Sequence, residues 1–171
     1  GCSNTNTSAQ IISVIPLPIV SANVSNSIIC FGSSVTLNGS GANTYTWSGN
    51  VSNGALFSPT TTLSYTVNGT NTLTGCTSTN APSQLITVNA LPSLTISASN
   101  SIICPGYATT LNISGASNYT WYPGGFTIPS IIQNPTITTT YTLVVENNSN
   151  GCTSTDQITV TVNQVPPIPD A

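Results

Sequence analysis

The sequence predicts an all-β fold built from tandem β-sandwich modules, and three observations lead to this prediction. Short stretches of alternating apolar and polar residues recur along the chain, as expected of strands with one buried face. Gly, Pro and Asn separate these stretches, and no window shows the period of an amphipathic helix. Two long segments also repeat each other almost without gaps. Duplicated blocks of short strands are typical of small sandwiches joined in series.

The repeat shows which residues of the two copies correspond to each other. Residues 17–47 align with residues 91–121 at an offset of 74, and after a two-residue insertion the offset becomes 76. The alignment matches Cys30 with Cys104, Trp47 with Trp121, Tyr65 with Tyr141, and Cys76 with Cys152. Residues that recur at fixed places in both copies are therefore expected to have the same structural role.

The alignment also predicts the domain boundaries. Residues 1–18 align with residues 75–92, so we expect 1–16 to form the final strand of a preceding module. Two whole modules then cover 17–90 and 91–165, and 166–171 form a linker to the next module, with prolines stiffening the junctions. Two explanations of the leading strand stay open: simple truncation of a longer array, or a strand that completes the sandwich of a neighbouring copy.

The alternating stretches predict the strands in order. In the first module they cover 34–37, 45–47, 63–67 and 85–88, and in the second 110–113, 119–121, 141–145 and 158–162. Turn residues lie between them, for example at 39–41, 68–69, 123–125 and 150–151. A module of this size is small for a sandwich core, so an added covalent link is expected.

The five cysteines allow two pairing schemes. Within modules the bonds are Cys30–Cys76 and Cys104–Cys152, which leaves Cys2 unpaired in this sequence; across modules they are Cys2–Cys30 and Cys76–Cys104. If modules run end to end, the strands between Cys76 and Cys104 hold these residues tens of Å apart, at about 3.3 Å per residue. A disulfide needs Cα atoms only about 4.4–6.8 Å apart. This argument favours one disulfide within each module.

The aromatic residues divide into core and loop positions. Trp47 and Trp121 fall on the predicted third strand, where immunoglobulin-like sandwiches keep a core Trp, and the alternative is a platform for stacking sugars. Tyr65 and Tyr141 match the corner tyrosine of such sandwiches, whose hydroxyl bonds to backbone. The residues nearer to loops, and hence the candidates for ligand contact, are Tyr122, Phe126 and Phe57.

Composition excludes several classes of function. The chain has no Lys, Arg or His, and its acidic residues are Glu146, Asp156 and Asp170. Acid–base and nucleophilic catalysis need positioned groups of which His is the commonest, and phosphate binding needs Lys or Arg. Calcium loops gather several carboxylates, and zinc sites use closely spaced cysteines; neither pattern occurs. We therefore expect no enzyme activity, no nucleic-acid binding, no metal and no cofactor.

The cysteines and the apolar segments predict the compartment in which the protein is found. Regularly spaced cysteines without metal-ligand spacing predict disulfides, and hence an extracellular protein that is secreted or attached to the cell surface. The longest apolar stretch, 11–20, contains two prolines and is too short to cross a bilayer, so no membrane insertion is expected.

A longer motif runs through both repeats. In the first it consists of Ile29-Cys30-Phe31-Gly32, Thr36-Leu37, Tyr45-Thr46-Trp47, Ser58-Pro59-Thr60-Thr61-Thr62, Tyr65-Thr66-Val67 and Gly75-Cys76. The second copy has Ile103-Cys104-Pro105-Gly106 and departs from the motif at 134–138. The motif resembles the immunoglobulin/PKD-like repeats of giant secreted surface proteins of Bacteroidota, including gliding adhesins and substrates of type IX secretion. The resemblance covers essentially the whole chain and implies spacer, adhesive or filament-forming modules.

The leading functional hypothesis is a structural one. We expect a non-catalytic section of an extracellular fibre, stalk or filament, whose partners are other copies or neighbouring modules of the same protein. The first alternative is an adhesin module that binds surface carbohydrate through Tyr122 and Phe126. The second is an accessory domain of a larger secreted enzyme. Exposure of the two loop rings beside a concave patch would favour the adhesin.

Overall fold

The computed structural model describes residues 10–115 and 118–164, and every structural statement below concerns these residues. The chain divides into two compact units, Gly1–Thr87 and Val88–Ala171, called unit 1 and unit 2. Each unit is described by itself. The predicted Cys2 and the predicted linker at 166–171 lie outside the described residues.

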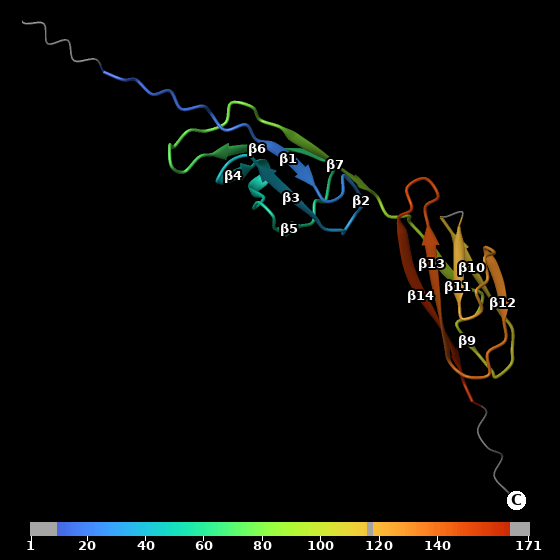
Figure 1. Cartoon of the computed structure of the whole chain (residues 1–171). Coiled ribbons are helices and arrows are strands. Elements are labelled where there is room, and N and C mark those ends of the chain that lie inside the picture. Colours follow the sequence, from blue (N-terminus) through green and yellow to red (C-terminus); the bar gives the residue numbers. More distant parts are fainter. Residues whose placement is uncertain (1–9, 116–117, 165–171) are drawn as a thin grey trace, which may run out of the picture. The chain divides into compact units, whose positions relative to one another are not determined.

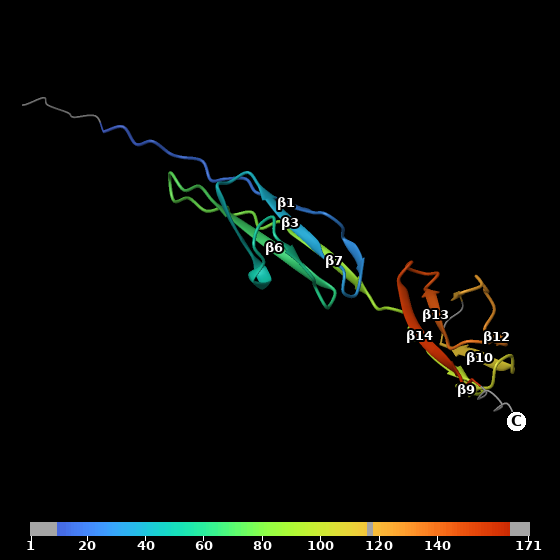
Figure 2. The ribbon, with the colours of Figure 1, turned by 90° about the horizontal axis from the view of Figure 1, so that it is seen from below.

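Unit 1 is made of short strands in two sheets (Figure 1, blue to green; Figure 2). One sheet has the order β1-β3-β5 and the other the order β2-β7-β6-β4. The elements are β1 (Ser21–Val24), β2 (Ile28–Cys30), β3 (Val35–Ser40), β4 (Thr44–Trp47), η1 (Ser48–Asn50), β5 (Leu56–Phe57), β6 (Leu63–Thr70) and β7 (Ser83–Asn89), of which the last two residues of β7 belong to unit 2.

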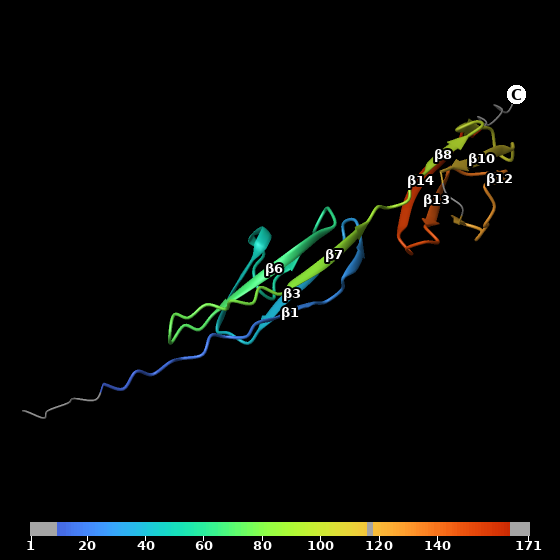
Figure 3. The same ribbon diagram turned by 90° about the horizontal axis from the view of Figure 1, so that it is seen from above.

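Unit 2 repeats this plan strand for strand (Figure 1, yellow to red; Figure 3). Its sheets have the orders β8-β10-β12 and β9-β14-β13-β11. The strands are β8 (Thr95–Ala98), β9 (Ile102–Ile103), β10 (Thr109–Ser114), β11 (Tyr119–Tyr122), β12 (Ser130–Gln133), β13 (Thr139–Glu146) and β14 (Thr153–Val162). Replacing each strand of unit 1 by the strand seven places later gives the strand orders of unit 2.

The core of unit 2 lies between its two sheets. Alternation along β13 buries every second residue, and the same holds in β10, because successive side chains of a strand point to opposite faces. The buried cluster draws on both sheets and contains Ile103, Leu111, Trp121, Ile131, Tyr141, Leu143, Val145, Val160 and Val162. In unit 1 the corresponding alternation buries Val35 and Leu37 on β3 and Tyr65 and Val67 on β6.

The segment before β1 lies outside both sheets of unit 1. Residues 10–20 form no strand, and Ile11 is 92% exposed. The assignment of 1–16 to the final strand of a preceding module stays a prediction. A strand exists only when its backbone pairs with a neighbour, and residues 10–16 have none in either sheet of unit 1. Within the described residues, no helix has the length and apolar character needed to cross a bilayer.

Candidate functional site

Chemically active groups are sparse in the described residues. No three side chains of His, Cys, Asp or Glu there come together as a metal site would require. The two carboxylates in this part, Glu146 and Asp156, both lie in unit 2, on β13 and β14. The remaining groups with chemistry of their own are the cysteines, so the candidate site is built around them.

The cysteines correct the sequence-based pairing. Cys30 and Cys152 are each disulfide-bonded, whereas Cys76 and Cys104 are free thiols. The predicted bonds Cys30–Cys76 and Cys104–Cys152 are therefore not formed. The alternative bond between Cys76 and Cys104 is not formed either, and Cys2 lies outside the described residues.

The length of β14 explains why unit 2 has no internal disulfide. Cys152 directly precedes the ten-residue strand Thr153–Val162. Cys104 directly follows Ile103, which pairs with Val162 at the far end of that strand. At about 3.3 Å per residue the two cysteines are held roughly 30 Å apart, far beyond the reach of a disulfide. Figure 1 shows the turn between β13 and β14 at one end of unit 2 and β9 at the other.

Unit 1 separates its two cysteines in the same way. The Thr87 N–H donates a hydrogen bond of 2.8 Å to the Ser27 carbonyl, which places β2 beside the last residues of β7. Cys30 ends β2, while Cys76 lies in the loop that precedes β7. We call the end with the β6–β7 or β13–β14 loop the leading end of a unit, and the opposite end the trailing end.

The turn that carries the leading-end cysteine is built alike in both units. In unit 2 the Asn147 N–H donates to the Cys152 carbonyl at 2.8 Å, and the Asn150 side chain accepts from the Cys152 N–H at 3.0 Å. In unit 1 the Asn71 N–H donates to the Cys76 carbonyl at 2.9 Å. Sequence reasoning placed turn residues at 150–151 but assigned none at 71–76, although the spacing Asn-x-x-x-Gly-Cys occurs in both repeats.

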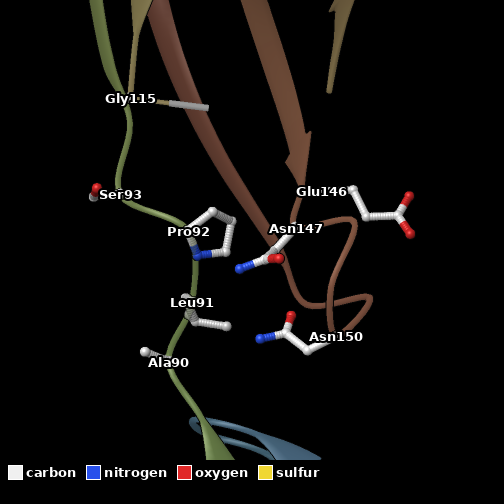
Figure 4. Close-up of a pocket in the computed structure, with 8 residues that line it drawn as sticks. All are labelled: Ala90, Leu91, Pro92, Ser93, Gly115, Glu146, Asn147 and Asn150. Atoms are coloured by element: carbon white, nitrogen blue, oxygen red, sulfur yellow. The ribbon is translucent and has the colours of Figure 1, made fainter. Parts of the chain in front are cut away.

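A hollow of about 410 Å³ lies beside this turn in unit 2. Its lining residues are Ala90, Leu91, Pro92, Ser93, Gly115, Glu146, Asn147 and Asn150. In Figure 4 the amides of Asn147 and Asn150 point toward the segment between β7 and β8 that carries Leu91 and Pro92, while the Glu146 carboxylate points away. One carboxylate and two amides provide no acid–base pair. The hollow is a feature of the segment through which the chain enters unit 2.

The leading end is also tied to the incoming segment of chain. The Ser154 hydroxyl donates to the Pro92 carbonyl at 2.8 Å, two residues beyond Cys152. In unit 1 the Asn80 side chain accepts from the Val20 N–H at 3.2 Å and donates to the Val20 carbonyl at 2.6 Å. In both units, therefore, the incoming chain runs beside the loop that carries the cysteine.

The aromatic residues predicted for the core are buried. Trp47 is 3% exposed and Trp121 is fully buried, so neither indole is available for stacking a sugar. Tyr65 and Tyr141 are buried as well, and burial raises the pKa of Tyr141 above its ordinary value. In unit 1 the tyrosine whose hydroxyl bonds to backbone is Tyr45, which the sequence analysis placed in the repeat motif without assigning it this role. Its hydroxyl donates to the Ala42 carbonyl at 2.6 Å and accepts from the Ala42 N–H at 2.9 Å.

The predicted ligand-contact residues lie on the β11 hairpin of unit 2. Tyr122 is 51% exposed and Phe126 is 40% exposed. The Trp121 N–H donates to the Phe126 carbonyl at 2.9 Å, which closes the hairpin. Neither ring lines the hollow beside Asn147 or the smaller one at Asn118.

Comparisons with known proteins add little. No family model and no curated protein matches the chain. A chain from the crystal structure of a mouse coronavirus receptor-binding domain complexed with its murine receptor is similar over 85% of this chain and 100% of that chain. The identity is 11% and the TM-score 0.36, a likeness too low to carry an argument.

Proposed function

We propose that the chain is a non-catalytic structural section of an extracellular surface fibre, stalk or filament. In this proposal the two units are tandem immunoglobulin-like β-sandwich modules that act as spacers or self-associate with neighbouring modules. The observation that carries it is the duplication: both units have the same order of strands in two sheets, and their sequences repeat at an offset of 74. Serial repetition of one small module is how extended arrays are built.

Two further features support an extracellular structural role. Disulfides persist in oxidising compartments, and the chain contains disulfide-bonded cysteines. With no Lys or Arg, the chain also offers no cleavage site to trypsin-like proteases, a property that suits an exposed fibre. A surface with so few charges presents little electrostatic repulsion between copies.

Electron microscopy of native surface material tests this proposal. We expect beaded rods with a repeat on the order of 35–40 Å, because a ten-residue strand at about 3.3 Å per residue sets the module length and a short junction adds to it. Antibodies against unit 2 should decorate these rods at regular intervals. Isolated globular particles that never form rods or stalks would contradict the proposal.

Carbohydrate binding is the second candidate, because Tyr122 and Phe126 are both exposed on one hairpin. Exposed aromatic rings can stack on sugar faces. A glycan array probed with the wild-type chain and with the double variant Tyr122→Ala and Phe126→Ala distinguishes this function. Binding that is lost in the double variant, but retained when the exposed Tyr107 is changed to Ala, would support it. No binding by the wild-type chain would argue against it.

A further inference from the structure

Asparagine followed by glycine occurs four times in the chain, at 38–39, 53–54, 68–69 and 150–151, and all four pairs lie in the described residues. Asparagine is a thermolabile residue, and it loses its side-chain amide most readily before glycine, which has no side chain to hinder the reaction. The four asparagines are exposed, so burial does not keep water from them. Any protection of these pairs therefore comes from hydrogen bonds and backbone geometry.

Loss of the amide makes two demands on the backbone. The glycine nitrogen gives up its proton and bonds to the asparagine Cγ, while the Cγ–Nδ2 bond breaks and ammonia leaves. Water then opens the resulting succinimide ring at either carbonyl and yields aspartate or isoaspartate. The glycine N–H must be free to lose its proton, and the chain must turn so that the glycine nitrogen reaches Cγ.

Two pairs of unit 1 hold each other. The Asn53 side-chain oxygen accepts from the Gly39 N–H at 2.7 Å and from the Trp47 Nε1–H at 2.9 Å. The Gly54 N–H donates to the Leu37 carbonyl at 2.8 Å. Both glycine N–H groups are therefore engaged, and the Asn53 carboxamide can turn toward Gly54 only by giving up both of its bonds.

The third pair of unit 1 lies on β6. The Gly69 N–H donates to the Ser78 hydroxyl at 3.1 Å, and the Ser78 N–H donates to the Gly69 carbonyl at 2.8 Å. A strand backbone is extended, with ψ about +135°, and the glycine nitrogen reaches Cγ only after a large rotation. That rotation would break the pairing of β6 with β4 at 68–69, and the pairing of β3 with β1 at 38–39.

The pair in unit 2 lies in the turn between β13 and β14. The Gly151 N–H donates to the Asn147 carbonyl at 2.8 Å. The Asn150 side-chain oxygen accepts from the Cys152 N–H at 3.0 Å. The nucleophile and the carboxamide are thus both bonded to other groups, as at 53–54.

We propose that the four Asn-Gly pairs are latent modification sites, at which the fold blocks succinimide formation until a unit opens locally. In every pair the glycine N–H donates a hydrogen bond although the asparagine is exposed. Reaction then proceeds only through open forms, whose population is set by the free energy of local unfolding. The block concerns each unit by itself and is independent of the proposed function.

A reaction at one of these sites makes an opening permanent. Residues 10–87 contain no carboxylate side chain, so deamidation of Asn53 would place a negative charge beside the Trp47 indole. An isoaspartate also adds one carbon atom to the main chain. On β3 or β6 this insertion would disturb the alternation that buries every second side chain.

Rates of amide loss test the proposal. The full chain is incubated at about pH 8 in buffer and in guanidinium chloride, digested with pepsin at low pH, and analysed by mass spectrometry for the conversion of amide to acid. Each pair should react at least about tenfold more slowly in the folded chain, since a tenfold slowing needs an opening free energy of only about 1.4 kcal/mol. Equal rates in the two samples at any of the four pairs would overturn the proposal.

Ser78→Ala separates the hydrogen bond from overall stability. It removes the acceptor of the Gly69 N–H, whereas the matched variant Ser64→Ala removes an exposed hydroxyl from the same strand. In the folded chain, Ser78→Ala should raise the rate at Asn68 by about fivefold, which corresponds to a hydrogen bond of about 1 kcal/mol. Ser64→Ala should leave that rate unchanged, and both variants should leave the other two pairs of unit 1 unchanged.

Two results with Ser78→Ala would overturn the proposal. An unchanged rate at Asn68 would show that the bond to the Gly69 N–H does not protect this pair. An equal rise at all three pairs of unit 1 would assign the protection to overall stability instead of to the individual bonds.

Discussion

The indoles of Trp47 and Trp121 occupy matching places in the two units but use different hydrogen-bond acceptors. The Trp47 Nε1–H donates to the Asn53 side-chain oxygen at 2.9 Å, and the Gly39 N–H donates to the same oxygen at 2.7 Å. The Trp121 Nε1–H donates to the Ile128 backbone carbonyl at 3.1 Å. In unit 1 a single side-chain oxygen therefore accepts hydrogen bonds from two donors. In unit 2 a backbone carbonyl is the acceptor for the indole N–H.

Asn53→Ala should destabilise unit 1 by about 1–3 kcal/mol, because it leaves the buried indole N–H and the Gly39 N–H without their acceptor. Asn38→Ala is the matched control, since Asn38 is an exposed residue of β3. Urea unfolding followed by Trp47 fluorescence in a Trp121→Phe background measures both variants. Equal midpoints for the two would show that the Asn53 oxygen contributes nothing to stability.

Tyr141 makes stability depend on pH in the alkaline range. Burial raises its pKa in the folded state, so the unfolded chain releases this proton first. The unfolded state then binds fewer protons than the native state, and the free energy of unfolding decreases with pH. Its contribution is fully present below the ordinary tyrosine pKa of about 10 and is lost as pH rises through the folded-state value.

Tyr141→Phe should therefore flatten the decline in the stability of unit 2 above about pH 10. Tyr107→Phe, which removes an exposed hydroxyl, should leave that decline in place. The measurement is chemical denaturation at pH 8, 9, 10 and 11, with Trp121 as the probe of unit 2 in a Trp47→Phe background. The same slope in Tyr141→Phe and wild type would assign the decline to other groups.

At the scale of secondary-structure elements, a glycine lets the incoming chain approach the β3–β4 turn. Gly41 has φ +94°, and a Cβ there would overlap the carbonyl oxygen of Ile19. Gly32 has φ +88°, but no atom lies within 4 Å of the position of its Cβ. An L residue at either position would therefore be strained by the positive φ. At Gly41 alone, its side chain would also collide with a neighbouring atom.

Gly32→Ala should destabilise unit 1 by about 1–2 kcal/mol, through the left-handed backbone alone. Gly41→Ala should cost about 1–3 kcal/mol more, because the new methyl group must displace the incoming segment. Thermal unfolding of the two variants gives the comparison. A Gly41→Ala variant no less stable than Gly32→Ala would mean that the incoming segment is not packed against the turn.

The strands with a clear alternation could be predicted from the sequence, among them the four-residue strands β4 and β11, whereas the two-residue strands could not. Alternation located β3, β6, β10 and β13, because strands of six to eight residues bury every second side chain. The two-residue strands β5 and β9 contain no alternation to detect, because pairing with a neighbour defines them. Burial of Trp47 and Trp121 followed from their place on alternating strands.

The cysteine pairing was wrong for a related reason. Cys30 and Cys76 were expected to pair because the alternative partners, Cys76 and Cys104, would be held tens of Å apart if modules run end to end. Cys30 instead ends β2, a strand that lies beside β7. In unit 2 the corresponding strands, β9 and β14, pair in parallel, and this pairing places Cys104 level with the end of β14. Only the register of that pairing shows that the closing strand keeps the two cysteines of a unit apart, and the sequence does not encode the register in any local signal.

On the scale of the whole molecule, charge is distributed unevenly. All three acidic residues lie in the sequence of unit 2, at 146, 156 and 170, and the chain has no cationic side chain. The described part of unit 1, residues 10–87, therefore has neither a carboxylate side chain nor a partner for one. Its stability depends on apolar burial and hydrogen bonds, neither of which is screened by salt as ion pairs are.

The stability of unit 1 should accordingly change by less than about 0.5 kcal/mol between 20 and 500 mM NaCl at pH 6, since salt acts mainly by screening charges. It should also stay constant between about pH 5 and 7, because residues 10–87 contain no Asp, Glu or His. Urea unfolding of the Trp121→Phe variant, followed by Trp47, measures both. In the control, Ser64→Lys combined with Leu85→Glu places opposite charges on paired residues of β6 and β7 and should introduce a salt dependence. A clear salt dependence in the chain without that pair would mean that charges outside unit 1 determine its stability.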